Sequence, residues 1–204
     1  MDVRPLAVPD AYEFTPRQHQ DDRGIFLEYF TGASLAEAVG HDLNLAQANC
    51  SVSTRGTLRG IHFAAVPPGQ AKYVTCAAGA GLDVVVDIRV GSPTFARWDM
   101  VRLDEQDRRA VYVAEGLGHA FFALSEHATL LYLCSQPYNP AAEHAISPVD
   151  PDLGLPWPAD VAPGLSLKDA AAPTLREAEA AGLLPGYADC LDRYRALREA
   201  VNPR

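Results

Sequence analysis

The middle of the chain alternates between short apolar segments and turn residues. Six segments rich in Val, Tyr, Phe and Leu are separated by Gly, Pro, Asp or Ser; they are AKYVTCAAG (71–79), GLDVVVDIRVG (81–91), RWDMVRLD (97–104), RAVYVAEG (109–116), HAFFALS (119–125) and ATLLYLCSQ (128–136). Their spacing of roughly ten residues is typical of strands in an antiparallel sandwich or barrel. We therefore predict a mainly β fold, a jelly-roll barrel of antiparallel strands whose mouth or interior holds a small ligand.

One of these segments carries charges at alternate positions. Side chains alternate between the two faces of a strand, so residues 82–89 place apolar side chains on one face and charged ones on the other. The charged residues are Asp83, Asp87 and Arg89. If their face points into the barrel, these buried charges are either paired with one another for structure or functional.

Helical patterns flank the β block. Ser34 and Glu37 have the spacing of a capping box and Gly40 supplies a stop, which predicts a short helix near 35–39. A second helix is predicted after Pro173, in TLREAEAAG. A third is predicted near the C-terminus, where four residues recur at helical spacing: Leu191, Tyr194, Leu197 and Val201. The proline-rich segment 139–164 is expected to run over the surface.

Length and composition favour one domain. With 204 residues, 48% of them hydrophobic, we expect a single domain over 1–204 with a helical C-terminal segment at about 174–204. The net charge of -9 argues against nucleic acid and membrane partners, so an anionic ligand needs a local basic site. The absence of a long apolar run or a signal-peptide pattern predicts a cytoplasmic protein. The four cysteines form no CxxC pair and are interpreted as reduced packing residues.

Basic residues gather in one segment, TRGTLRGIHFAAVPPGQAKYV (54–74). Arg59 and His62 would point to opposite faces of a regular strand unless Gly60 introduces a bulge. A lone His in a strand is more often a hydrogen-bonded structural residue, and a lone charge such as Lys72 is usually solvated. Spacing alone therefore does not unite these side chains.

Other candidates are equally ambiguous in isolation. His119 stands between glycines and an aromatic pair, and Tyr132 lies between leucines, where packing is the ordinary role of a tyrosine. Tyr138 follows in a turn between prolines, where an exposed ring can stack on a flat ligand. Lys168 and Asp169 are adjacent after a loop, and most such pairs are surface charges.

Taken together, these fragments resemble the motifs of the dTDP-4-dehydrorhamnose 3,5-epimerase family, a group of cupin-like jelly-roll proteins. The matching fragments, in chain order, are DDRGIFLEYF, QANCSVSTRGTLRGIHF, PPGQAKYV, DVVVDIRVGSPTF, GLGHAFFAL, LLYLCSQPY and LSLKDAAAP, within residues 5–185. GQAKY, GSPTF and DPDLGLPWP look most like the actinobacterial branch that epimerises dTDP-4-keto-6-deoxyhexoses for antibiotic sugars. The resemblance implies epimerisation at C3, C5 or both, without a cofactor.

The resemblance also implies a role for each matched position. His62 corresponds to the general base, and Asp169 to the carboxylate that orients it. Tyr132 corresponds to the proton donor on the opposite face, and Lys72 to a residue near the sugar ketone. Contacts with the nucleotide sugar are implied for Arg23, Phe26, Glu28, Gln47, Asn49, Arg59, His119, Tyr138, Glu143 and Lys168, with Tyr138 stacking on thymine. Because residues 23–28 reach the partner subunit's site in such enzymes, a homodimer with strand exchange is implied.

Three alternatives stay open. Within the family, the enzyme inverts a single centre, C3 or C5. From other classes, the chain is a metal-dependent cupin enzyme that uses His62 and His119, or a sugar-nucleotide binding module without catalysis. Because His62 is followed by Phe63 and Ala64 and does not complete the H-x-H pair of metal-binding cupins, we expect no metal site. One position departs from the family, since Cys50 stands where relatives often carry His.

Overall fold

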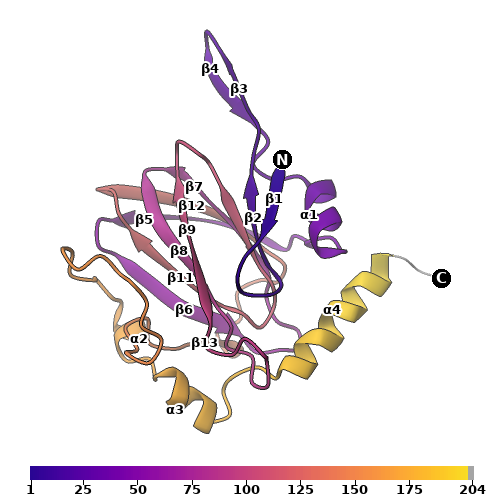
Figure 1. Cartoon of the computed structure of the whole chain (residues 1–204), viewed down its shortest axis with the longest axis vertical. Coiled ribbons are helices and arrows are strands. Elements are labelled where there is room, and N and C mark those ends of the chain that lie inside the picture. Colours follow the sequence, from indigo (N-terminus) through magenta and orange to yellow (C-terminus); the bar gives the residue numbers. More distant parts are fainter. Residues whose placement is uncertain (202–204) are drawn as a thin grey trace.

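The strands of the computed structural model, which describes residues 1–201, form two antiparallel sheets that pack face to face (Figure 1). The larger sheet is six-stranded, in the order β1 (Asp2–Pro5), β2 (Ala11–Thr15), β10 (Ala110–Val113), β7 (Lys72–Ala78), β12 (His127–Cys134) and β5 (Gln47–Thr54). The smaller sheet is five-stranded, in the order β13 (Glu143–Ala145), β6 (Leu58–Ala64), β11 (Gly118–Ala123), β8 (Ala80–Val86) and β9 (Trp98–Asp104).

The remaining elements lie around this sandwich. The hairpin of β3 (Gln18–Asp21) and β4 (Gly24–Leu27) projects from the body (Figure 1). The helices are α1 (Gly32–Val39), α2 (Leu167–Ala170), α3 (Leu175–Ala180) and α4 (Tyr187–Val201). In the described part of the chain, none of them is long and apolar enough to cross a membrane.

All six strands predicted from apolar segments are present, as β7 to β12. The mainly β fold of antiparallel strands with a few short peripheral helices is thereby confirmed. The predicted barrel is not closed, because the strands divide into two separate sheets. The division of the chain into domains stays a prediction, and residues 202–204 of the segment 174–204 lie outside the described residues.

Apolar side chains form two cores. The larger includes inward-facing residues of both sheets, such as Val74 and Phe121, and residues on the outer face of the six-stranded sheet, such as Tyr73, which packs against Phe14 and Phe30. The smaller covers the outer face of the five-stranded sheet, where Ile61 and other residues of that sheet pack against the proline-rich segment and α3. The expectation that residues 139–164 run over the surface was wrong in part, because this segment adds β13 to the sheet and buries Ile146 and Leu153.

The helix predictions were correct in place and wrong in one detail. Helix α1 begins at Gly32, two residues before Ser34, because the extended backbone of Thr31 lets its side chain accept a hydrogen bond from the Ser34 amide and cap the helix. Gly40 ends α1 with φ 85°, as predicted. Thr174 and Glu177 form a complete capping box at α3.

The third predicted helix is α4. It buries Tyr194 and Leu197 against the body, whereas Leu191 is partly exposed. The side chain of Val201 lies outside the described residues.

Cysteine packing was predicted correctly for three of the four residues. Cys76, Cys134 and Cys190 are free and buried. Cys50 is free but exposed, because it points to the outer face of the edge strand β5.

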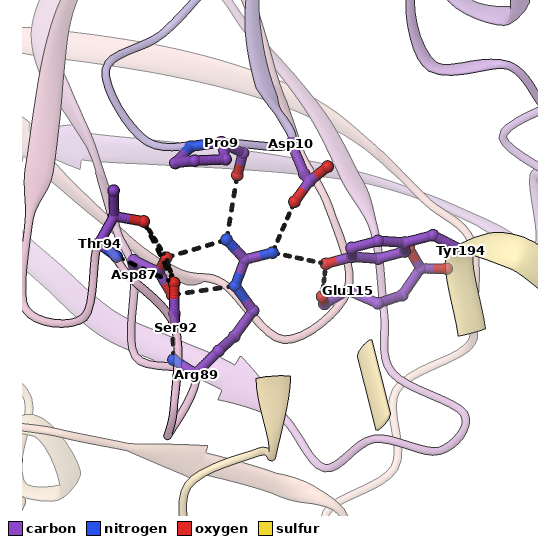
Figure 2. A network of polar contacts seen from close by, with 8 residues as sticks. All are labelled: Pro9, Asp10, Asp87, Arg89, Ser92, Thr94, Glu115 and Tyr194. Atoms are coloured by element: carbon purple, nitrogen blue, oxygen red, sulfur yellow. Dashed lines mark hydrogen bonds and ion pairs between the residues drawn. The ribbon is translucent and has the colours of Figure 1, made fainter. Parts of the chain in front are cut away.

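A buried polar cluster around Arg89 connects distant parts of the chain (Figure 2). Its guanidinium group donates to both carboxylate oxygens of Asp87, to Asp10, to the carbonyl of Pro9 and to the hydroxyl of Tyr194. Asp87 also accepts hydrogen bonds from Ser92 and Thr94. The cluster ties the N-terminal segment and α4 to the end of β8.

Two of the three charges predicted on one face of a strand are therefore structural. Asp87 and Arg89 follow the last residue of β8, so the alternation of a strand does not extend to them. They are fully buried and paired with each other at 2.9 Å. Asp83 lies within β8 and has a different environment.

Candidate active site

A cavity of about 370 Å³ lies between the two sheets. One wall is formed by inward-facing residues of the six-stranded sheet: Gln47, Asn49, Ser51, Lys72, Val74, Leu130 and Tyr132. The other wall is formed by residues of the five-stranded sheet: Arg59, His62, His119, Phe121 and Glu143. Gln70 and Tyr138 complete the lining from the connecting loops. The cavity thus collects nine of the fourteen side chains that the sequence predicted for the site.

A bulge in β6 brings Arg59 and His62 to the same side. His62 pairs with His119, but Arg59 pairs with Phe121, so β6 contains one extra residue between these pairs. Gly60 sits in the bulge with φ 112°, and a Cβ atom there would lie 2.5 Å from the carbonyl oxygen of His119. Only glycine fits this backbone, and the bulge is the condition under which the sequence allowed Arg59 and His62 to share a face.

His62 is held by a carboxylate on α2. Its Nε2 lies 2.7 Å from Oδ1 of Asp169, whose side chain is 5% exposed while that of His62 is 36% exposed. The side chain of Ser166 caps α2 by accepting from the Asp169 amide. Burial alone would raise the pKa of Asp169, but the hydrogen bond and charge of His62 lower it overall. Asp169 is therefore ionised at neutral pH. It fixes the orientation of the His62 ring through Nε2, and Nδ1 is the ring nitrogen that Asp169 does not contact.

His119 has a carboxylate partner of its own. Its Nε2 lies 2.8 Å from Oδ2 of Asp83, whose side chain is completely buried. The other oxygen of Asp83, Oδ1, has no hydrogen-bond partner among residues 1–201. Because His119 and His62 are direct cross-strand partners, two carboxylate-backed imidazoles stand side by side on one wall.

Lys72 and Tyr132 come from the opposite wall. Burial lowers the pKa of Lys72, although the charges of Glu143 and Asp83 act in the other direction. Burial raises the pKa of Tyr132, so its phenol keeps its proton at neutral pH. A proton acceptor on one sheet and a proton donor on the other therefore border the same space.

Five predicted site residues are not among those that line the cavity. Arg23 and Phe26 lie on the projecting hairpin, with Arg23 paired to Asp21 and Phe26 69% exposed. Glu28 directly follows this hairpin. Lys168 is exposed on α2, beside Asp169, which touches the cavity only through His62.

The sequence analysis missed five lining residues: Ser51, Gln70, Val74, Phe121 and Leu130. Four of them stand two positions from a predicted residue on the same strand, so the alternation of strand side chains could have found them. Gln70 lies in a loop, where no periodicity applies.

Metal-binding side chains do not gather here. Within residues 1–201, no group of three or more His, Cys, Asp and Glu side chains is arranged to hold a metal ion. His62 and His119 each engage Nε2 with a carboxylate. With no third ligand arranged beside them among these residues, the two histidines lack the ligand set that the metal-dependent alternative needs.

Comparisons with known proteins agree with this geometry. Residues 5–177 match the family model described as dTDP-4-dehydrorhamnose 3,5-epimerase. The dTDP-4-dehydrorhamnose 3,5-epimerase of Mycolicibacterium smegmatis is 56% identical over 97% of this chain and 98% of its own length.

Two solved structures are also closely similar. The rmlC epimerase of Mycobacterium tuberculosis has a TM-score of 0.95 at 52% identity, over 97% of this chain and 100% of that chain. ChmJ, a 3'-monoepimerase from Streptomyces bikiniensis in complex with dTDP-quinovose, has a TM-score of 0.93 at 52% identity, over 95% of this chain and 98% of that chain. The chain belongs to the dTDP-4-dehydrorhamnose 3,5-epimerase family, whose members are isomerases of sugar nucleotides.

Proposed function

We propose that this protein epimerises a dTDP-4-keto-6-deoxyhexose at C3, at C5 or at both, by removing a proton next to the ketone and returning one to the opposite face. The observation that carries the proposal is the position of His62 and Tyr132, which face one cavity from opposite sheets. A sugar ring between these walls has a base on one face and an acid on the other. Inversion of a carbon requires this arrangement.

The first step forms an enolate. His62 takes the proton from the carbon beside the ketone, and the electron pair of the broken C–H bond moves onto the ketone oxygen. Lys72 lines the same cavity and supplies a positive charge for that oxygen. Asp169 stabilises the imidazolium that forms, because it is an ionised carboxylate 2.7 Å from the ring.

The second step returns a proton. The Tyr132 hydroxyl gives its proton to the carbon from the other face, the ketone reforms, and the phenolate regains a proton from solvent. The raised pKa of Tyr132, caused mainly by burial, keeps this donor protonated before the step. No redox change occurs, and the proton taken up by His62 returns to solvent, so the reaction balances without a cofactor.

The nucleotide part of the substrate supplies the anion for the basic residues. Arg59 lines the cavity, and its Nε donates to the Ser53 hydroxyl at 3.0 Å, which leaves its terminal nitrogens for a pyrophosphate. Tyr138 is exposed at the cavity lining, where its ring suits stacking on thymine.

The decisive experiment is incubation with dTDP-4-keto-6-deoxyglucose in deuterated water with a chelator present, followed by NMR. Deuterium at C3, at C5 or at both identifies the inverted carbons and separates a single-centre enzyme from a 3,5-epimerase. His62→Ala should abolish incorporation, whereas His127→Ala, an exposed histidine at the start of β12, should not. Unchanged exchange in His62→Ala would remove His62 from the role of base, and a protein without turnover would be a binding module.

The role of Tyr132 has its own test. Tyr132→Phe removes only the hydroxyl, so it should spare the first deuterium exchange more than it spares inversion at C5. Full product formation by this variant would refute Tyr132 as the donor.

We also propose a homodimer in which the hairpin completes the partner's site. Ile25 and Phe26 are exposed on the projecting hairpin, and Val52 is 61% exposed on the outer face of the edge strand β5. These surfaces fit burial against a second copy. Mixing Arg23→Ala with His62→Ala subunits should restore about a quarter of wild-type activity, because half of the dimers are mixed and each has one intact site. No recovery, with dimers present by ultracentrifugation, would contradict the exchange.

A further inference from the structure

A chain of hydrogen bonds runs along one wall of the cavity, away from the loop that carries Tyr138. The backbone N–H of Tyr138 donates to Oε1 of Gln47 at 2.9 Å, and Nε2 of Gln47 donates to Oδ1 of Asn49 at 2.8 Å. Nδ2 of Asn49 then donates to Sγ of Cys134 at 3.6 Å. Three side chains on β5 and β12 thus connect the loop backbone to a buried thiol.

The direction of every bond in this chain is fixed by its first member. A backbone N–H can only donate, so the atom of Gln47 that faces Tyr138 must be the amide oxygen. The Gln47 nitrogen therefore faces Asn49, whose oxygen must accept, and the Asn49 nitrogen is left facing the sulfur. Removing the acceptor at Cys134 frees Asn49 to rotate, which loosens each bond back to the loop.

Cys134 lies where it can connect the loop to the reacting groups. In the sheet register it stands between Gln47 of β5 and Lys72 of β7, two residues after Tyr132 on the same face of β12. It is buried, and burial raises the pKa of its thiol, so the sulfur stays neutral and accepts from Asn49. The chain therefore ends beside Lys72.

We propose that Cys134 is a positioning residue that acts through Asn49 and Gln47 to hold the Tyr138 loop against the cavity. Its importance for catalysis rests on the proposed function, because Tyr138 is the residue proposed to stack on the nucleotide base. In addition to any contact of their own with the ligand, Gln47 and Asn49 then act indirectly, because each holds the next member of the hydrogen-bond chain in place. A second hydrogen bond, from Nε2 of Gln70 to the carbonyl of Gln136, holds the start of the same loop independently of Cys134.

The first test needs no ligand. Amide hydrogen exchange of the intact protein should be about threefold to tenfold faster at Tyr138 in Cys134→Ala, since a hydrogen bond of ordinary strength is weakened. Cys134→Ser keeps an acceptor and should restore slow exchange. Cys76→Ala is the matched control, because Cys76 is another buried cysteine in the same sheet and its thiol donates to the Ala78 carbonyl. Equal exchange at Tyr138 in the wild type and Cys134→Ala would overturn the proposal.

The second test is a double-mutant cycle with dTDP as the probe, measured by calorimetry. Cys134→Ala should weaken dTDP binding about threefold to tenfold in the wild-type background and clearly less in Tyr138→Ala, because most of its effect passes through that residue. Equal weakening in both backgrounds would show a general structural effect and overturn the proposal. If Cys134→Ala does not fold, Cys134→Val, which fills the site better and also removes the acceptor, takes its place in the exchange test. A wild-type protein that binds no dTDP would contradict the proposed function, while the exchange test would still decide the role of Cys134.

Discussion

The Arg89 cluster and the cavity both contain charged side chains in the interior, but they differ in how completely these are satisfied. Arg89 and Asp87 are 0% exposed, and the five N–H groups of the guanidinium all have acceptors (Figure 2). In the cavity, His62 is 36% exposed and Oδ1 of Asp83 has no partner among residues 1–201.

This difference separates a structural cluster from a site that binds and reacts. A saturated cluster leaves no group free to take up a ligand or a proton, so its contribution is to hold segments together. The cavity keeps polar groups facing open space, and its two histidines are each supported from behind by a carboxylate. Asp83 and Asp87 stand on the same predicted strand face, yet one backs His119 and the other only binds Arg89 and its neighbours.

The largest effect is expected from Arg89→Leu. This change leaves Asp87 buried without its cation, which should lower the free energy of unfolding by about 3–5 kcal/mol. The measurement is urea unfolding, with activity per folded molecule measured below the transition. Arg102→Leu is the control, because its pair with Asp104 is exposed on the arginine side and should contribute less than about 1 kcal/mol. Equal losses in the two variants would contradict the comparison.

Asp169→Asn should show the opposite behaviour. The variant loses the charge that stabilises the His62 imidazolium, so turnover should fall about a hundredfold. The free energy of unfolding should change by less than about 1 kcal/mol, because His62 is partly solvated. Steady-state kinetics and urea unfolding of the same preparation measure both quantities. Asp152→Asn, which removes an exposed pair with Arg176, should alter neither.

A smaller effect is expected from Ser92→Ala within the Arg89 cluster. The hydroxyl donates to Oδ2 of Asp87 at 2.6 Å, and that oxygen keeps other donors after the change. The expected loss of stability is about 1 kcal/mol, with activity unchanged. A loss as large as that of Arg89→Leu would mean that the cluster depends on this hydroxyl more than on the ion pair.

The smallest effect is expected on the free energy of unfolding at acid pH. Burial alone would raise the pKa of Asp169, but its bond with His62 holds the pKa below its ordinary value of 3.8. The unfolded chain therefore binds more protons than the folded one, and stability falls as pH drops below 3.8 through the folded value.

Asp169→Asn has no carboxylate here that takes up a proton on unfolding. The free energy of unfolding of this variant should therefore depend less steeply on pH than that of the wild type, by a slope that corresponds to at most about one proton. Urea unfolding from pH 5 downward measures it, and parallel slopes in the wild type and the variant would contradict the lowered pKa.

The strands were predictable because their signal is local. Val residues in segments such as 82–86 and Phe residues in segments such as 119–125 favour a pleated backbone wherever the sheet lies. The start of α1 was missed because two side chains, those of Thr31 and Ser34, could both cap, and the backbone at Thr31 decides between them. The burial of Ile146 depends on an outer sheet face that no local pattern reveals.

The site was predictable as a set of residues and less so as an arrangement. The motifs named His62, Lys72 and Tyr132, and all three line the cavity. Arg59 lies on the same side as His62 only because of the bulge at Gly60, which the sequence permits but does not require. The connection through Cys134 depends on the register of three strands, and spacing along the chain carries no information about it.

The Arg89 cluster also has a consequence for the order in which a new chain can mature. Its partners lie at residues 9–10 and at residue 194, far apart in the sequence. While α4 is still inside the ribosome, the guanidinium group lacks Tyr194. We expect the sandwich to become fully stable only after α4 has emerged, so that chains truncated within α4 are removed by proteases.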